Sequence, residues 1–221
     1  MNTDGLAGRR VVVSAGPTFE DLDPVRFLGN RSSGKMGFAI AAAAARRGAQ
    51  VVLVAGPVAL PTPGGLQRID VRSAAQMHSA VMAALPADIF IGAAAVADFT
   101  PATVAAEKIK KRPGEDGLVL QLVRTADILA DVAASEARPA LVVGFAAETG
   151  DVEANARAKL EGKHLDLVCA NRVGVEGSGF ESDDNALLVL GHGLRVELGP
   201  ASKTDLATAL LDIVAQRLPA R

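Results

Sequence analysis

The fold is decided by residues 35–57, which read KMGFAIAAAAARRGAQVVLVAGP. We expect a helix over 35–47, because the hydroxyl of Ser32 or Ser33 can accept a hydrogen bond from an N–H group at its start. Gly48 stands where a left-handed residue commonly ends a helix. The stretch therefore opens with a helix whose two ends are both marked.

Apolar runs flank this helix on both sides. Residues 11–13 and 51–54 are apolar and mostly β-branched, and a Gly-Pro pair follows shortly after each run. Short runs bounded by turn residues are typical of buried strands. A strand, a helix and a second strand at this spacing predict a parallel β-α-β unit.

The same alternation continues along the chain and indicates the fold class. Strands that alternate with helices predict a Rossmann-like α/β fold, a doubly wound parallel sheet. The further strands are expected at 66–71, 89–93, 140–145 and 165–170, and the further helices at 74–85, 126–136 and 152–163.

Two segments depart from the alternation. Residues 186–190 and 194–198 surround a Gly-His-Gly turn, and the second run alternates apolar with charged side chains, which predicts a C-terminal antiparallel hairpin. A last helix follows, with Leu206, Leu210, Ile213 and Val214 on one face. Residues 97–117 include a basic cluster and show no apolar period, and long loops of this kind are usually functional. We expect one domain over 1–221.

Composition excludes several classes of protein. The formal net charge of −2 and the pI near 5.9 argue against a nucleic-acid partner, which requires a basic excess. Cys169 is the one cysteine, so we expect a buried, unpaired thiol and no thiolate metal cluster. The longest apolar run is too short to span a membrane, and the first residues do not resemble a signal peptide. We therefore expect a cytoplasmic protein with no protein metal site.

The loop 29–35 has the spacing of a phosphate-binding P-loop, G-x-x-x-x-G-K. Two features argue against that reading: Met36 replaces the magnesium-binding Ser or Thr, and the loop does not directly follow the first strand. Hydroxyls and main-chain N–H groups at a helix start still favour an anion. Asn30 adds an amide that can both donate and accept.

Seven segments share the pattern of one enzyme family. They are Ser14–Thr18, Leu22–Phe27, Asn30–Gly37, Ala94–Phe99, Lys108–Lys111, Val143–Thr149 and Gly179–Asn185. In this order, and over nearly the whole chain, they resemble the signature of phosphopantothenoylcysteine synthetase.

The resemblance implies a ligase of coenzyme A biosynthesis. Members of the family join L-cysteine to 4′-phosphopantothenate, whose carboxylate is first activated by a nucleoside triphosphate. Bacterial members of this type use CTP, which arrives with Mg²⁺, and form an acyl-cytidylate that cysteine then attacks. The family is dimeric, so a homodimer is implied, with 97–117 as the flap and dimerisation segment. In bacteria this domain is commonly fused to a flavin-dependent decarboxylase.

The resemblance also implies roles for individual residues. Asn30 would hold the activated acyl group and Lys108 would neutralise the departing pyrophosphate, which makes these two the catalytic candidates. The remaining substrate-binding candidates are Ser32, Ser33, Gly34, Lys35, Ala94 and Ala95.

A second set of residues is implied to bind the nucleotide. It consists of Asp98, Lys108, Ala126, Asp127, Ile128, Leu129, Phe145, Lys159 and Lys163. Some of these have an alternative role: Asp98 could instead cap a turn at a strand end, Phe145 could belong to the core rather than stack on the base, and Lys108 could lie in a solvated basic loop. Lys159 and Lys163 could likewise lie on a solvated helix face. Lys159 and Lys163 are four residues apart on a predicted helix and so share one face.

Two other classes of function are weighed against the synthetase. A Rossmann-like oxidoreductase or NTPase needs a glycine-rich turn directly after a strand and an acidic residue closing the second strand, whereas 54–56 reads Val-Ala-Gly. A non-catalytic binding module would leave the polar residues at the strand ends unexplained.

Overall fold

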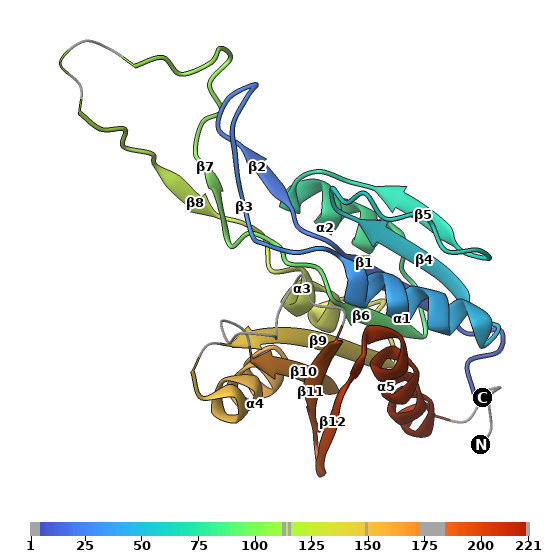
Figure 1. Ribbon diagram of the computed structural model, residues 1–221. Helices are drawn as coiled ribbons and strands as arrows, with labels where there is room; N and C mark the ends of the chain where they lie inside the picture. Colours follow the sequence, from blue (N-terminus) through green and yellow to red (C-terminus); the bar gives the residue numbers. More distant parts are fainter. Residues whose placement is uncertain (1–4, 112–113, 115, 149, 173–183, 220–221) are drawn as a thin grey trace.

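The computed structural model describes residues 5–111, 114, 116–148, 150–172 and 184–219, and it is built on one eight-stranded sheet (Figure 1). The strands are ordered β12-β11-β10-β9-β6-β1-β4-β5. Their bounds are β1 Arg10–Ala15, β4 Gln50–Ala55, β5 Gln67–Asp70, β6 Ile89–Gly92, β9 Leu141–Glu148, β10 Leu167–Arg172, β11 Asp184–Gly191 and β12 Leu194–Ser202.

The parallel part of the sheet is doubly wound, as the sequence predicts. Counted along the chain, its six parallel strands lie in the order 3-2-1-4-5-6, which is the Rossmann order. The expected C-terminal hairpin is present as well, since β11 pairs antiparallel with both β10 and β12. The predicted fold class is confirmed.

Helices cover both faces of the sheet. Helices α1 (Lys35–Arg46) and α5 (Lys203–Arg217) pack on one face, and α2 (Ala74–Ala83), α3 (Ile128–Ala134) and α4 (Val152–Gly162) pack on the other. Neighbouring strand residues divide between the two cores: Val11 and Val13 face α1, whereas Val12 faces the opposite layer. Burial on both faces explains why these strands are continuously apolar.

The ends of α1 correct one prediction and confirm another. Neither serine is the N-cap residue; the N-cap is Gly34, at φ 75°. Ser32 instead accepts a hydrogen bond from the Gly34 N–H, at 3.3 Å. The loop turns into the helix through a left-handed residue, a conformation that glycine adopts without strain. Gly48 has φ 78° just after the helix, as expected.

Two small hairpins were not predicted. β2 (Phe19–Asp21) pairs with β3 (Phe27–Gly29), and β7 (Phe99–Pro101) pairs with β8 (Leu122–Arg124). We call residues 19–29 the hairpin and the described residues of 99–124 the arm. Both extend away from the sheet, side by side (Figure 1). Their strands are three residues long and contribute little to the core, so no apolar period marks them in the sequence.

Cys169 and His192 lie where the sequence predicts them. Cys169 is a buried free thiol in β10, and burial raises its pKa. His192 lies in the turn between β11 and β12. Within the described ranges no helix is long and apolar enough to cross a membrane. Those ranges also contain no cluster of three or more His, Cys, Asp or Glu side chains suited to a metal ion.

Candidate active site

Two cavities lie where the winding of the sheet reverses. After β1 the chain first adds β4 and β5 on one side of β1, and it later adds β6 on the other side, with Ser14 in register with Gly92. In open parallel sheets ligands bind outside the carboxyl ends of the strands at this point. The loop that follows β6, residues 93–96, contributes to the walls of both cavities.

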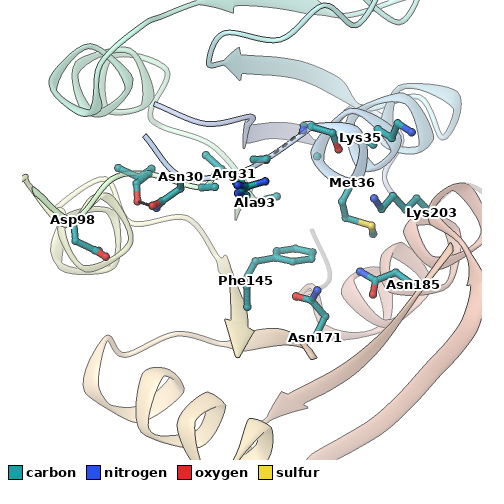
Figure 2. Close-up of a pocket in the computed structure, with 18 of the residues that line it drawn as sticks. Asn30, Arg31, Lys35, Met36, Ala93, Asp98, Phe145, Asn171, Asn185 and Lys203 are labelled. Atoms are coloured by element: carbon teal, nitrogen blue, oxygen red, sulfur yellow. Dashed lines mark hydrogen bonds between the residues drawn. The ribbon is translucent and has the colours of Figure 1, made fainter. Parts of the chain in front are cut away.

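The first cavity has a volume of about 560 Å³ and lies beside α1 and α5 (Figure 2). It brings together all the residues predicted to bind substrate: Asn30, Ser32, Ser33, Gly34, Lys35, Ala94 and Ala95. Asn171, Asn185 and Lys203 also line it. Residues that are separated by most of the chain length therefore meet around one space.

The second cavity has a volume of about 530 Å³ and lies beside α3 and α4. Most of the predicted nucleotide-binding residues line it: Asp98, Ala126, Asp127, Ile128, Leu129, Phe145, Lys159 and Lys163. Five residues belong to both cavities and form what we call the shared wall: Ala94, Val96, Asp98, Phe145 and Lys159. The two predicted groups thus occupy adjoining spaces.

Asn30 is held by the loop after β6. Its Nδ2 donates a hydrogen bond to the main-chain oxygen of Val96, at 2.9 Å. The same loop is fastened to the end of β1, because the Ala95 N–H donates to the Gly16 carbonyl at 2.9 Å. With its amide nitrogen engaged, Asn30 has its Oδ1 available as an acceptor for a donor in the cavity.

Lys159 supplies a largely buried cation in the shared wall. It lies in the last turn of α4, and its Nζ donates to the main-chain oxygen of Phe145, at 2.6 Å. Burial and then the nearby Lys163 lower the pKa of Lys159, while Glu148, Asp127 and Asp98 oppose that shift. An anionic ligand beside this ammonium group would raise the pKa again.

Asp127 has two partners that fix it in place. As the N-cap of α3 it accepts from the Ala130 N–H at 3.2 Å, and it forms an ion pair with Lys163 at 2.7 Å. Burial alone would raise the pKa of Asp127, but these hydrogen bonds and the Lys163 charge lower it overall. Lys159 and Lys163 thus lie on the cavity side of α4, as their spacing predicts.

The sequence leaves open whether the side chains of Asp98 and Phe145 can contact a ligand or have only a structural role. The N–H of Thr125 donates to the main-chain oxygen of Asp98 at 3.0 Å, and its hydroxyl donates to that of Ala97 at 2.7 Å. The side chain of Asp98 is exposed and lines both cavities. Phe145 is half-buried: one part packs on the core and another borders both cavities. Both side chains are therefore accessible to a ligand.

Lys108 is not brought together with the other candidates. It is exposed on the arm and lines neither cavity of its own chain. Its neighbour Ile109 is fixed to the hairpin through Asp23, whose carboxylate accepts from the N–H groups of Val25, Arg26 and Ile109 at 2.8, 2.8 and 3.0 Å. The hairpin therefore sets the position of the chain next to Lys108.

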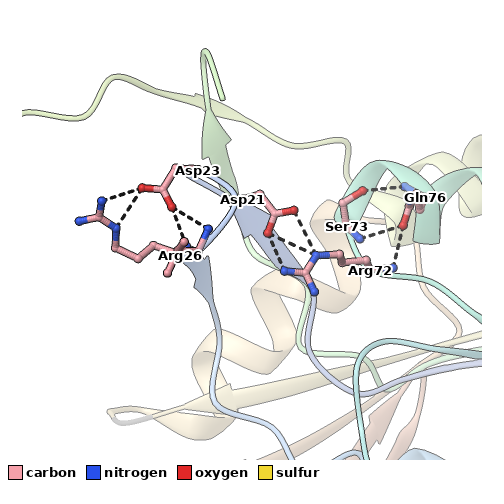
Figure 3. Close-up of polar contacts among 7 residues, drawn as sticks. Asp21, Asp23, Arg26, Arg72, Ser73 and Gln76 are labelled. Atoms are coloured by element: carbon pink, nitrogen blue, oxygen red, sulfur yellow. Dashed lines mark hydrogen bonds and ion pairs between the residues drawn. The ribbon is translucent and has the colours of Figure 1, made fainter. Parts of the chain in front are cut away.

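Arg26 completes this contact between hairpin and arm. Its guanidinium donates to Asp23 Oδ2 at 2.7 Å and also to the Ile109 carbonyl, and Figure 3 shows the Asp23–Arg26 pair beside a second pair, Asp21–Arg72. Burial raises the pKa of Asp23, but its hydrogen bonds from Ile109, Val25 and Arg26 outweigh burial and lower it. Asp23 therefore stays ionised at neutral pH.

An Asp23→Asn change is expected to release the arm from the hairpin while the sheet remains folded. An amide in place of the carboxylate weakens the charge-assisted bonds to Arg26 and Ile109. Hydrogen exchange at the Ile109 amide should become faster by about tenfold, since the weakened bonds also protect that amide. Exchange in β1 and β4 should be unchanged, and an equal acceleration there would instead indicate global destabilisation.

The first cavity also includes three residues, from β10, β11 and α5, that were not among the predicted site residues. Lys203 follows Ser202 at the start of the last helix, a position that in sequence indicates only a helix start. Asn171 lies near the end of β10 and Asn185 near the start of β11, and only the fold brings these two next to the loop 30–37. Asn185 ends a quoted family segment, of which residues 179–183 lie outside the described ranges, as does Thr149 of another.

Comparison with known proteins gives consistent matches over nearly the whole chain. A family model described as the DNA/pantothenate metabolism flavoprotein C-terminal domain matches residues 6–218. The coenzyme A biosynthesis bifunctional protein CoaBC of Vibrio cholerae is 54% identical over 215 residues, which are 96% of this chain and 54% of that protein. Its counterpart in Escherichia coli is 52% identical over 209 residues, 94% of this chain and 52% of that protein.

A solved structure agrees with these matches. The crystal structure of the C-terminal domain of a CoaBC protein superposes with a TM-score of 0.82 at 36% identity, covering 97% of this chain and 98% of that one. The chain spans about half the length of the curated relatives that it matches.

Proposed function

Since the chain belongs to the family of DNA/pantothenate metabolism flavoprotein C-terminal domains, we propose that it is a phosphopantothenate–cysteine ligase of coenzyme A biosynthesis. The observation that carries the proposal is the shared wall, which sets a nucleotide-sized cavity against a substrate cavity. A reaction that transfers a nucleotidyl group to a carboxylate needs this adjacency. The family match favours the ligase over the competing hypothesis, an oxidoreductase or NTPase.

In the proposed first step, a carboxylate oxygen of 4′-phosphopantothenate attacks the α-phosphorus of CTP. The bond from that phosphorus to the β-phosphate oxygen breaks, and pyrophosphate leaves. CTP would lie in the second cavity, where Lys159 and Lys163 face its phosphates and Phe145 can stack on the base. Mg²⁺ would arrive bound to the triphosphate, because it prefers phosphate oxygens and retained water.

In the proposed second step, the amine of L-cysteine attacks the activated acyl carbon. A C–N bond forms, the C–O bond to the nucleotide breaks, and CMP leaves while the amine loses a proton. Asn30 lies on the substrate side of the shared wall, and its Oδ1 can accept from the incoming amine. We therefore assign Asn30 to the second step rather than the first.

The proposed activity is tested by pyrophosphate release. The protein should release pyrophosphate from CTP only when 4′-phosphopantothenate is present, and CMP and the cysteine amide should appear when L-cysteine is added. Replacing CTP with ATP or GTP in the same assay tests the selectivity for the base. Release that does not require a pantothenate compound would overturn the proposal.

Nucleotide binding is expected to take up a proton through Lys159. The lowered pKa of Lys159 leaves part of the population neutral at alkaline pH, and a bound triphosphate raises that pKa, so affinity should fall as pH rises through the lowered value. Well below that pH, Lys159 is charged in both states and no uptake occurs. Calorimetry in buffers of different ionisation enthalpy measures the uptake. It should vanish in Lys159→Met but persist in Arg157→Met on the exposed side of α4.

We also propose that the protein forms a homodimer through the hairpin and the arm. In the described part of the chain the exposed large apolar side chains all belong to these two segments: Val25, Phe27, Phe99, Val104, Leu118, Val119, Leu120, Leu122 and Val123. Val119 is 97% exposed, and a cluster of this size usually marks an interface. In such a dimer, Lys108 of one copy would lie over a cavity of the other copy. Sedimentation velocity tests the assembly.

The remaining length of the relatives suggests a further partner. They are named as bifunctional proteins, and the chain matches about half of each. We propose that a flavin-dependent decarboxylase domain accompanies this domain in the full-length protein.

A further inference from the structure

Lys203 is a buried lysine that lines the first cavity. It is the first residue of α5, directly after the N-cap Ser202, and it is only 7% exposed. A lysine here lies at the positive end of the helix dipole, where a cation is unfavourable. Lysine is also among the residues least often buried. Lys203 therefore brings a positive charge to the wall of the cavity.

The charges around the cavity favour an anionic ligand. Its lining includes four cationic side chains, Arg31, Lys35, Lys159 and Lys203, whereas Asp98 is the one carboxylate among the lining residues that are described. The start of α1 borders the same space, and its N–H groups favour an anion too. A ligand that fills the cavity would therefore carry negative charge.

Lys203 and Asp98, a residue of the shared wall, lie at opposite ends of the cavity. Figure 2 shows Asp98 at one end and Lys203 at the other, near Met36 and Asn185. The carboxylate of 4′-phosphopantothenate has to reach the nucleotide, so that end of the molecule belongs at the shared wall. Its phosphate is separated from this carboxylate by the full length of the pantothenate chain, and so it would lie at the end where Lys203 is found.

We propose that Lys203 binds the phosphate of 4′-phosphopantothenate and selects this substrate over pantothenate. The inference rests on the proposed function. The ammonium group would pair with the phosphate, and the amides of Asn185 and Asn171 lie on the same side of the cavity, where they can donate to its oxygens (Figure 2). The two ends of the substrate would then be recognised by different elements, α5 and the shared wall.

The test compares two substrates in one variant. Lys203→Met keeps the apolar stem of the side chain but loses the charge, and Lys203→Arg keeps the charge. In Lys203→Met, kcat/KM for 4′-phosphopantothenate should fall about 10- to 100-fold, the range expected for a charge-assisted bond. The value for pantothenate, which has no phosphate, should remain unchanged, and Lys203→Arg should recover part of the loss. Arg46→Gln, which removes an exposed charge from α1, serves as the control.

The outcomes separate this inference from its alternatives. A rise in the KM for CTP alone would assign Lys203 to the triphosphate, and a rise in the KM for L-cysteine alone would assign it to the cysteine carboxylate; either overturns the proposal. An equal loss with pantothenate and 4′-phosphopantothenate, or a lowered melting temperature that accounts for the loss, would mean a structural role and also overturns it. If the unaltered protein releases no pyrophosphate with 4′-phosphopantothenate, the proposed function itself fails.

Discussion

An Asn30→Asp variant should accumulate the activated acyl-nucleotide and form the amide at least about 100-fold more slowly, the cost of losing one well-placed polar contact in the transition state. The amide nitrogen of Asn30 donates to the Val96 carbonyl, so a carboxylate would set one oxygen against another there. The altered side chain would also present a negative charge to the activated acyl group. The first step should continue, because most of the proposed CTP contacts lie in the second cavity.

Rapid quenching would separate the two steps for Asn30→Asp. A burst of pyrophosphate close to one equivalent, followed by slow release of CMP, is the expected signature. Gln216→Glu makes the same amide-to-acid change on the exposed side of α5 and should behave like the unaltered protein. Equal slowing of both steps would contradict a specific role for Asn30 in amide formation.

A Gly56→Ala variant should be destabilised by about 3 kcal/mol or more, since overpacking against fixed main chain has no easy relief. A Cβ atom on Gly56 would lie 1.7 Å from the main-chain oxygen of Pro17. Both partners are backbone at the carboxyl ends of neighbouring strands, so neither can rotate away as a side chain does. The strain would fall on the loop after β1, which leads toward the first cavity.

Gly64→Ala is the matched control for this change. A Cβ atom at Gly64 meets nothing within 4 Å, so the substitution should be close to neutral. Urea unfolding of both variants gives the two free energies directly. If Gly56→Ala unfolds at the same urea concentration as Gly64→Ala, the close approach between β4 and the Pro17 loop is not rigid.

The parallel sheet was predictable because its strands carry a local signal. Continuous apolar runs such as 51–54 are required by burial on both faces, and a Gly-Pro pair ends two of them. The hairpin and the arm carry no such signal, since their three-residue strands are held by cross-strand contacts such as the stacked rings of Phe19 and Phe27, 3.8 Å apart. The cap of α1 was mispredicted because a serine before a helix does not reveal a left-handed glycine at the next position.

The residues of the candidate site also divide into those that the sequence could predict and those that it could not. Residues within quoted family segments, such as Asn30 and Asp98, could be proposed from the sequence, and the fold places them at the cavities. Lys203 could not, because its importance comes from α5 packing beside α1, a contact between distant parts of the chain. Lys108 was proposed from the sequence, yet the arm holds it outside the cavities of its own chain.

The shared wall has a thermodynamic consequence. Phe145 and Lys159 border both cavities, so a ligand that reorients either side chain in one cavity changes the affinity of the other. Such coupling is reciprocal: if the nucleotide tightens the binding of the acid by some factor, the acid tightens the binding of the nucleotide by the same factor. Two substrates that meet at one pair of side chains would then bind cooperatively, and each would be held most firmly when the other is present.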